Sequence, residues 1–475
     1  MFRKQWCAMG LAALFSATAS VQAQNTQTSQ SLLSVRVISV DTKDAATIPS
    51  KIVFSSAPRN ASPAPGRLRL AGQSLALQDA GTPAPKPLQS SEVAAPEAAP
   101  AEEPPLGPTL PEDVKLLQHA LFGEAHDECK TGLRLFGWID AGYTYASSGS
   151  GLLPVEPREN RFGNELLLNE AALVLEKPLD PNQLSFGFNA TFYAGADAAL
   201  LLPEGGFTTT NPRFGADFRQ LYVSAHLPVL TDGGVDIKAG RMGTIIGYES
   251  ALAPYRPFYS NDYQWFYAQD GAFTGLLATL HVDKQLDVIG GITLGANTFF
   301  TQRGDSPCFI GQVNYWLDEE KNTLVSASTY LGHYAIFAAP QFTSRQEEDY
   351  TFELRLQHKF NKCLEMIIQS DDGFATEVPN APHGGQWYSL YDILIYHMSC
   401  TLDLNGRAEW FLDNHGTRTG IATDYYELTV GLDYHPVKAL RIRPEVRWDV
   451  ADDPVWHGGR DKSLLTVAAD AIFSF

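Results

Sequence analysis

The amino-acid sequence predicts an all-β fold: a transmembrane, antiparallel, up-and-down β-barrel of about 16 strands that follows a disordered N-terminal extension. Apolar and polar residues alternate with a period of two in many segments after Thr131, which is typical of strands with one apolar and one polar face. Short turn-rich links alternate with long loops between these segments. The final segment ends on an aromatic residue, Phe475. Together these observations favour an outer-membrane barrel.

The first 23 residues are typical of a secretory signal peptide. Arg3 and Lys4 precede an apolar run from Trp6 to Phe15, and small residues lead to the expected cleavage site after Ala23. No later run of about 18 or more apolar residues appears. This pattern excludes a helical membrane protein. It does not exclude a barrel, because apolar residues alternate with polar ones along barrel strands and form no long apolar run.

Residues 24–130 are predicted to form a periplasmic extension or linker that is largely disordered. Stretches such as EVAAPEAAPAEEPPLGP cannot bury enough apolar surface to offset the entropy of ordering. Ser34 to Val40 is a possible isolated strand, and Pro111 to Leu121 is expected to form a short amphipathic helix. The chain therefore divides into a signal peptide (1–23), this extension (24–130) and a β domain (131–475).

The β domain repeats the alternating pattern throughout. In LSFGFNATFY, Leu184, Phe186 and Phe188 share one face, while Ser185 and Asn189 share the other. The segments YELTVGLDYH, LDVIGGITLGAN, FIGQVNYWL and FELRLQH have the same pattern. One β domain with a constant polar side is therefore expected.

The connections predict the number of strands. Seven short links are expected, at 176–183, 227–234, 283–285, 318–322, 359–362, 404–406 and 435–438. Eight long loops are expected, at 146–165, 195–216, 244–272, 298–307, 334–348, 371–391, 414–424 and 451–462. Their strict alternation gives 16 strands, with both termini at the end that carries the short links. In a bacterial outer-membrane barrel, that end faces the periplasm.

The last strand distinguishes the barrel from a secreted sandwich or jelly roll, which is the alternative fold. In LLTVAADAIFSF, Leu465, Val467 and Phe473 share a face that ends at Phe475. This pattern resembles the C-terminal signal by which the barrel-insertion machinery recognises outer-membrane barrels. Phe473 and Phe475 are therefore the candidate assembly signal.

Charge and cysteine spacing exclude several functional classes. The formal net charge of −19 argues against nucleic acid as a partner and against a polybasic membrane-surface protein. Cys129, Cys308, Cys363 and Cys400 contain no C-x-x-C pair, so no zinc or redox site is predicted, although up to two disulfides are allowed. We expect no catalytic residue, no cofactor and no metal.

Six segments of the β domain resemble a known family: FGWIDAGYTY (136–145), LNEAALVLEKP (168–178), RQLYVSAHLPV (219–229), VDIKAGRMGTIIGYES (235–250), PFYSNDYQWFYAQDGAFTGLLATL (257–280) and RPEVRWD (443–449). They are similar to the OmpL-like putative beta-barrel porin-2 family of Gram-negative outer-membrane proteins, over residues 131–475. The resemblance implies a channel in the outer membrane of a Gram-negative-type bacterium. After Gly240-Arg241 the resemblance implies an aromatic residue and a proline, and this chain has Met242 and Ile245-Ile246 instead.

One strand illustrates the expected lumen. A barrel of this size is wide enough to hold water. In LRIRPEVRWDV the expected lipid-facing residues are Leu440, Ile442, Val446 and Trp448. The predicted pore-lining residues are Arg441, Arg443, Glu445, Arg447 and Asp449. An alternative role for the arginines is a salt-bridged structural ladder with Glu445 and Asp449.

The third long loop, 244–272, is predicted to fold into the barrel as a constriction. It is the longest loop, and its many aromatic residues argue against disorder. The candidate constriction residues are Glu249, Tyr255, Arg256, Tyr259, Asp262 and Asp270. Their acids are expected to face wall arginines and to create a transverse field that selects solutes. Alternatively, the loop caps the outer mouth through aromatic packing.

These features predict a porin that allows passive diffusion of small hydrophilic solutes or ions through a water-filled barrel. Its partners would be outer-membrane lipids, the barrel-insertion machinery and the solutes, and the chain would be a monomer or a homotrimer with both termini in the periplasm. One alternative is a non-conducting barrel that acts as an adhesin or a structural scaffold. A second is a hydrolase at Asp413 to His415, where no neighbouring serine supplies a nucleophile.

Overall fold

The computed structural model of the chain describes residues 108–122, 132–147, 151–152, 160–335, 346–378, 381 and 383–475. The predicted signal peptide, most of the predicted extension, the possible strand at 34–40 and Cys129 lie outside the described residues. The division of the chain at residues 23 and 130 therefore stays a prediction.

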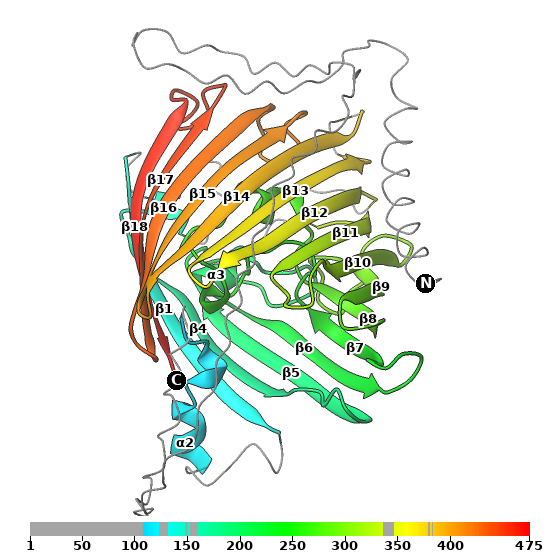
Figure 1. The fold of residues 1–475 in the computed structure, drawn as a ribbon. Helices are drawn as coiled ribbons and strands as arrows, with labels where there is room; N and C mark the ends of the chain where they lie inside the picture. The colour runs from blue at the N-terminus through cyan, green and yellow to red at the C-terminus, as the bar shows by residue number, and fades with distance from the viewer. Residues whose placement is uncertain are drawn as a thin grey trace, which may run out of the picture. The chain divides into compact units, whose positions relative to one another are not determined.

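A closed antiparallel barrel of sixteen strands is formed by the described part of the chain (Figure 1). Each barrel strand pairs with the next along the chain, and β18 pairs with β1 to close the ring. The strands are β1 (Arg134–Ala146), β4 (Leu166–Lys177), β5 (Ser185–Gly195), β6 (Gly215–Leu227), β7 (Val235–Met242), β8 (Phe273–His281), β9 (Leu286–Ala296), β10 (Cys308–Trp316), β11 (Thr323–His333), β12 (Glu348–Asn361), β13 (Leu364–Thr376), β14 (Gly385–Ser399), β15 (Leu402–Asp413), β16 (Thr423–Val437), β17 (Leu440–Ala451) and β18 (Ser463–Ser474). A separate two-stranded sheet joins β2 (Gly151–Leu152) and β3 (Phe162–Gly163). The predicted fold class and strand number are confirmed.

Alternation places apolar side chains on the outer face of the barrel and polar side chains inside it. On β16, Leu428 and Val430 are each 50% exposed, whereas Glu427 and Thr429 are buried. On β17, Trp448 is 52% exposed. Closing the sheet leaves no strand edge with unpaired backbone groups, which lipid could not satisfy. A register slip of one residue would turn the charged face towards lipid, so the register is strongly fixed.

The connections differ at the two ends of the barrel. One end, which we call the turn end, carries the links 178–184, 228–234, 282–285, 317–322, 362–363, 400–401 and 438–439. The opposite end, the loop end, carries the longer connections. β1 starts and β18 finishes at the turn end. This is the predicted layout.

Two predicted connections are wrong in position. The link expected at 404–406 lies inside β15, and the chain turns at 400–401 instead. Asn405 and Gly406 favour turns, but both pair with β14 because the barrel register continues through them. The loop expected at 371–391 is shorter, since β13 and β14 extend into it from both sides.

Short helices accompany the barrel. The predicted helix at 111–121 is present as a 3-10 turn, η1 (Pro111–Asp113), followed by α2 (Leu116–Phe122). α3 (Ala196–Leu200), η2 (Ala253–Tyr255) and the π-helix η3 (Gln264–Ala268) lie within long connections. None of the described helices has the length and apolar character needed to span a membrane. Cys308, Cys363 and Cys400 are free thiols.

Candidate functional site

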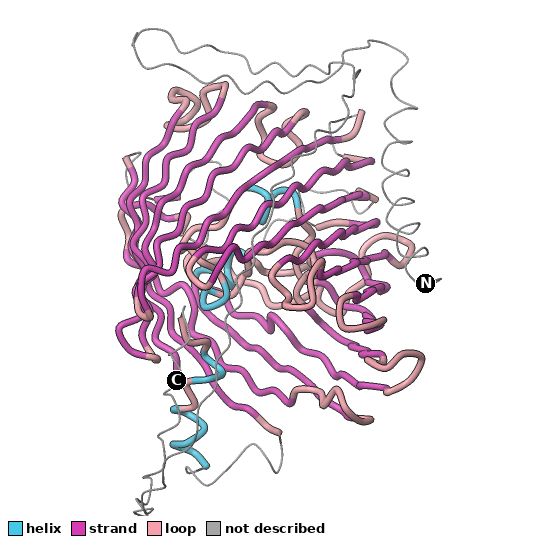
Figure 2. The backbone as a smooth tube through the Cα atoms, viewed as in Figure 1, coloured by secondary structure: helices cyan, strands magenta, loops and turns pink. Residues whose placement is uncertain are grey.

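Residues 243–272, which connect β7 to β8, lie inside the barrel, and we call them the inner loop. Figure 2 shows loop segments running inside the ring of strands. The inner loop forms hydrogen bonds to β4, β12, β13, β15 and β17, which are spread widely around the wall. Phe258, Tyr259 and Tyr263 are at most 1% exposed. The loop is therefore an interior element, and a cap over the outer mouth does not fit this position.

Wall carboxylates hold the backbone of the inner loop by its N–H groups. Three glutamates accept such bonds: Glu445 from Tyr259 (3.0 Å) and Ser260 (3.2 Å), Glu409 from Tyr263 (2.7 Å) and Gln264 (2.8 Å), and Glu170 from Ala253 (3.1 Å). A buried backbone N–H group that lacks a partner within regular secondary structure must find an acceptor elsewhere. Each glutamate is a buried acceptor for the N–H groups of one stretch of the loop, so it fixes that stretch in place.

Wall arginines hold the same backbone by its carbonyl groups. The donors and acceptors are Arg441 to Pro254 (2.7 Å) and Arg256 (3.0 Å), Arg443 to Ala253 (2.9 Å) and Arg256 (2.8 Å), Arg407 to Ser260 (2.9 Å), and Arg447 to Asn261 (2.5 Å). The guanidinium fork suits this task because it offers several donors at fixed angles. Three of the predicted pore-lining arginines thus face the barrel interior but are covered by the loop.

Each of these arginines also pairs with an acid. Arg441 pairs with Asp433, Arg443 with Asp470, Arg447 with Asp449 (2.8 Å), and Arg407 with both Glu427 (3.0 Å) and the loop residue Glu249 (2.5 Å). The expectation that loop acids face wall arginines holds for Glu249 and Arg407, whereas Arg441, Arg443 and Arg447, the arginines named for it, pair with wall acids instead. Of the ladder named as an alternative, only the pair Arg447–Asp449 is seen among the described residues, whereas Glu445 accepts hydrogen bonds from the loop amides.

The other predicted loop residues have separate partners. Arg256 lies 3.6 Å from Asp197 of α3, and the Tyr259 hydroxyl donates to Asn169 of β4 at 3.1 Å. Asp262 accepts a hydrogen bond from the Trp265 backbone N–H at 2.6 Å, at the start of η3. Each side chain is buried. The predicted constriction residues are therefore brought together in one packed element, and their role in selecting solutes stays a proposal.

Burial changes the titration of two loop acids. Desolvation raises the pKa of Asp262 well above its ordinary value, and the nearby Glu249 and Glu409 carboxylates raise it further. Desolvation also raises the pKa of Asp270 to about 7. The Asp270 carboxylate is 2% exposed and accepts a hydrogen bond from the Thr244 hydroxyl at 3.0 Å. Asp270 therefore titrates near neutral pH inside the folded barrel.

Aromatic packing also holds the inner loop in place. Tyr263 stacks on Phe411 of β15 with ring centroids 6.1 Å apart, and its hydroxyl donates to Asp449 at 2.9 Å. α3 folds inward from the connection after β5, so that Leu200 and Leu201 pack with Trp265. The loop is thus held by side-chain burial as well as by charged contacts.

Polar interior groups at the turn end stay partly exposed. The side chains of Glu176, Asp236, His281 and Asp287, from β4, β7, β8 and β9, are 21%, 25%, 31% and 35% exposed. Lys238 of β7 lies 5.2 Å from the centre of the Tyr222 ring and is also partly exposed. At the turn end, the wall from β4 to β9 therefore presents partly exposed charges. Nearer the loop end its charged groups, such as Arg241 and Asp217, are buried like those under the inner loop.

Other predicted sites have structural contacts. The Asp413 carboxylate accepts backbone hydrogen bonds from Thr417 (3.0 Å), Arg418 (2.9 Å) and Thr419 (2.7 Å), so it fixes the turn that follows β15. Phe473 is 47% exposed on the outer face, and Phe475 exchanges backbone hydrogen bonds with Gly137 of β1. Within the residues the structure describes, no cluster of three His, Cys, Asp or Glu is placed to bind a metal ion.

Sequence reasoning missed several residues that hold the loop. Arg407 and Glu409 share a face with Asn405 in the alternating segment LDLNGRAEW, but the turn expected at 404–406 concealed that strand. Glu170 lies beside a register shift between β1 and β4, where simple alternation fails. Reading β15 as one strand would have found the first two.

Comparison with known proteins agrees with this architecture. A family model described as "Putative beta-barrel porin-2, OmpL-like" matches residues 132–475. OmpF of Salmonella typhi, solved in complex with daunomycin, is 12% identical with a TM-score of 0.50, covering 72% of this chain and 97% of that chain. The outer membrane channel DcaP of Acinetobacter baumannii is 10% identical with a TM-score of 0.49, covering 73% and 98%. At 12% identity the OmpF structure shows similarity of fold alone. A search of curated proteins finds no match.

The first prediction concerns the anchoring of the inner loop. Glu445→Gln keeps the shape of the acceptor but loses its charge, so the Tyr259 and Ser260 amides should open about tenfold more often, for a loss of ~1.5 kcal/mol. Hydrogen exchange followed by mass spectrometry should show faster exchange across 252–264 and no change in the strands. Glu320→Gln, on the exposed turn after β10, is the matched control. Unchanged exchange in the loop would contradict the anchoring.

The second prediction concerns pH. The Asp270 carboxyl stays neutral in the folded barrel up to about pH 7 but ionises above its ordinary pKa of 3.8 when unfolded. Stability is therefore lost as the pH rises from about 4 to 7, and Asp270→Asn should be more stable than the parent at pH 8, by up to ~4 kcal/mol. Urea unfolding in lipid vesicles at pH 4 and pH 8 measures this. Asp232→Asn, on an exposed turn, should show no such difference, and equal behaviour of the two variants would refute the assignment.

Proposed function

The chain belongs to the "Putative beta-barrel porin-2, OmpL-like" family, and we propose that the inner loop is the constriction of its channel. As a member of this family, it is an outer-membrane porin for passive diffusion of small hydrophilic solutes or ions. On this proposal, solutes pass between the inner loop and the wall from β4 to β9. The observation that carries the proposal is the asymmetry of the interior. Charges under the loop are paired and buried, while the charged side chains at the turn end of the wall from β4 to β9 remain partly exposed.

We propose a weak preference for cations. The arginines beneath the inner loop are matched by acids, so little positive charge is left to attract anions. Glu176, Asp236 and Asp287 add negative charge to the solvated wall, and Lys238 opposes them. The transverse field expected between loop acids and wall arginines is replaced in this proposal by the charges of the wall from β4 to β9.

We further propose that the turn end faces the periplasm, as short connections do in bacterial barrels. On this proposal, β1 begins and β18 ends on the periplasmic side. Phe473 and Phe475 would be read there by the insertion machinery, and the folded chain would act as a monomer or a homotrimer among outer-membrane lipids.

A second candidate function is a non-conducting barrel that serves as an adhesin or a structural scaffold. Dense packing of the inner loop favours it, because buried aromatic and charged contacts occupy a large part of the interior. Planar-bilayer recording separates the two functions. Discrete open steps identify the porin, and a folded, inserted barrel without current identifies the scaffold.

The third prediction tests the constriction. Deleting residues 252–264 removes the segment that Glu445, Arg443 and Arg441 hold, so single-channel conductance should rise because water replaces it. Recordings from the deletion and the parent in the same lipid measure the difference. A deletion of residues 458–460 is the control, since these exposed residues lie in the connection between β17 and β18 at the loop end. Equal single-channel conductance of the 252–264 deletion and the parent would contradict the proposal that the inner loop is the constriction.

The fourth prediction tests the path along β7. Lys238→Glu reverses a charge in the solvated wall, so the reversal potential under a KCl gradient should shift towards stronger cation selectivity. Lys284→Glu makes the same change on the exposed turn after β8, outside the barrel. At ~0.1 M salt, screening over about 10 Å should leave that control with a smaller shift. Equal shifts of the reversal potential for the two variants would contradict a solute path along β7.

A further inference from the structure

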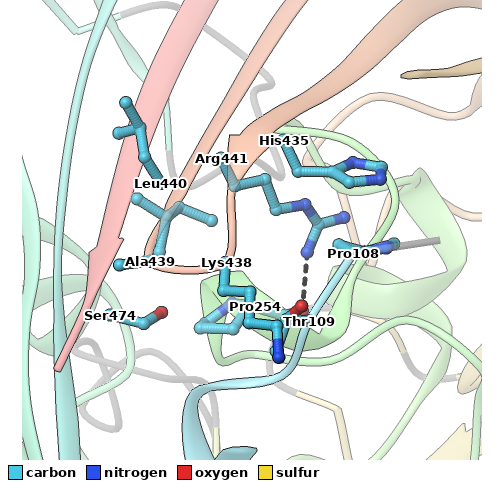
Figure 3. A pocket seen from close by; sticks show the side chains of 10 residues that line it. Pro108, Thr109, Pro254, His435, Lys438, Ala439, Leu440, Arg441 and Ser474 are labelled. Atoms are coloured by element: carbon cyan, nitrogen blue, oxygen red, sulfur yellow. Dashed lines mark hydrogen bonds between the residues drawn. The ribbon is translucent and has the colours of Figure 1, made fainter. Parts of the chain in front are cut away.

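The segment Pro108–Phe122, which we call the strap, lies at the turn end of the barrel. Pro108 and Thr109 line a small pocket together with Pro254 of the inner loop and with Lys438 and Ala439 of the turn between β16 and β17 (Figure 3). In Figure 3 the Arg441 side chain reaches across this pocket to the Pro254 carbonyl. The strap therefore meets the inner loop beside the turn between β16 and β17.

Two contacts fix the strap in this place. The Tyr255 hydroxyl donates a hydrogen bond to the Glu112 carboxylate at 2.8 Å, across 143 residues of sequence. The Leu135 backbone N–H at the start of β1 donates to the Gln118 side-chain oxygen at 3.3 Å, and Gln118 is only 4% exposed. One contact attaches the strap to the inner loop, and the other attaches it to the wall.

Tyr255 is itself held firmly. Its ring packs edge-on against Trp138 of β1, with centroids 6.1 Å apart, and the Trp138 indole N–H donates to Glu170 at 2.5 Å. Glu170 in turn accepts the backbone N–H of Ala253 in η2. The hydroxyl of Tyr255 is thus a fixed donor, and a charge-assisted bond to it docks whatever carries the acceptor.

We propose that the strap is a second constriction, at the proposed periplasmic mouth, and that Glu112 and Tyr255 are the residues that dock it and set the size limit there. This inference rests on the proposed porin function and extends it. The inner loop keeps its own anchors on Arg441 and Arg443 when the strap leaves. Releasing the strap therefore widens the mouth without releasing the loop.

Single-channel recording of the full chain tests the proposal. Glu112→Ala and Tyr255→Phe each remove the docking bond, so each should raise the occupancy of a higher-conductance level by about tenfold. The double variant should go no further, because both changes break the same contact. Asp113→Ala removes the neighbouring, exposed carboxylate and should behave as the parent.

A deletion of residues 108–122 provides a second variant that does not depend on one hydrogen bond, and it should reach the higher conductance permanently. If both single variants and this deletion match the parent while the 252–264 deletion conducts more, the strap proposal is overturned and the porin proposal stands. If the folded parent and the 252–264 deletion pass no current, both proposals are overturned. Additive effects of Glu112→Ala and Tyr255→Phe would also overturn the docking contact.

Discussion

The interior of this barrel depends on one constraint: an irregular backbone segment inside the wall must find hydrogen-bond partners for its N–H and C=O groups. The inner loop has little regular structure to supply them. Wall glutamates accept hydrogen bonds from its N–H groups, and wall arginines donate hydrogen bonds to its carbonyl groups. The charged residues on the inner faces of β15 and β17 therefore fix the backbone of the inner loop in one position. On the proposed function, that position determines where solutes pass.

Burying so many charges is costly, and the arrangement offsets that cost by pairing. Arg407, for example, is fully buried but bonds two carboxylates, Glu249 and Glu427, and one loop carbonyl, that of Ser260. Removing one partner of such a group leaves an uncompensated charge, which is more damaging than never having buried the pair. Charges used in this way are neutralised by their partners. On the proposed function, the field that a passing ion meets is set mainly by the partly exposed charges at the turn end of the wall from β4 to β9.

The sequence predicts much of the fold because the alternation within each strand shows which of its side chains face lipid and which face the interior. Alternation in YELTVGLDYH assigns Leu428 and Val430 to lipid and Glu427 to the interior without reference to any other strand. The links and loops then give the strand number. Predictions fail where local signals conflict with register, as at Asn405 and Gly406, whose turn chemistry is overridden by pairing with β14. They fail again beside the register shift that turns Glu170 inward.

By itself, the sequence determined which side chains face inward, how many strands there are and which loop is long enough to enter the barrel. Only the tertiary structure decided that Arg441, Arg443 and Arg447 pair with wall acids, and that Glu445 holds the Tyr259 amide from 186 residues away. Alternation is a property of neighbouring residues and can be read locally. The choice of partner depends on how strands and loops from distant parts of the chain meet in space.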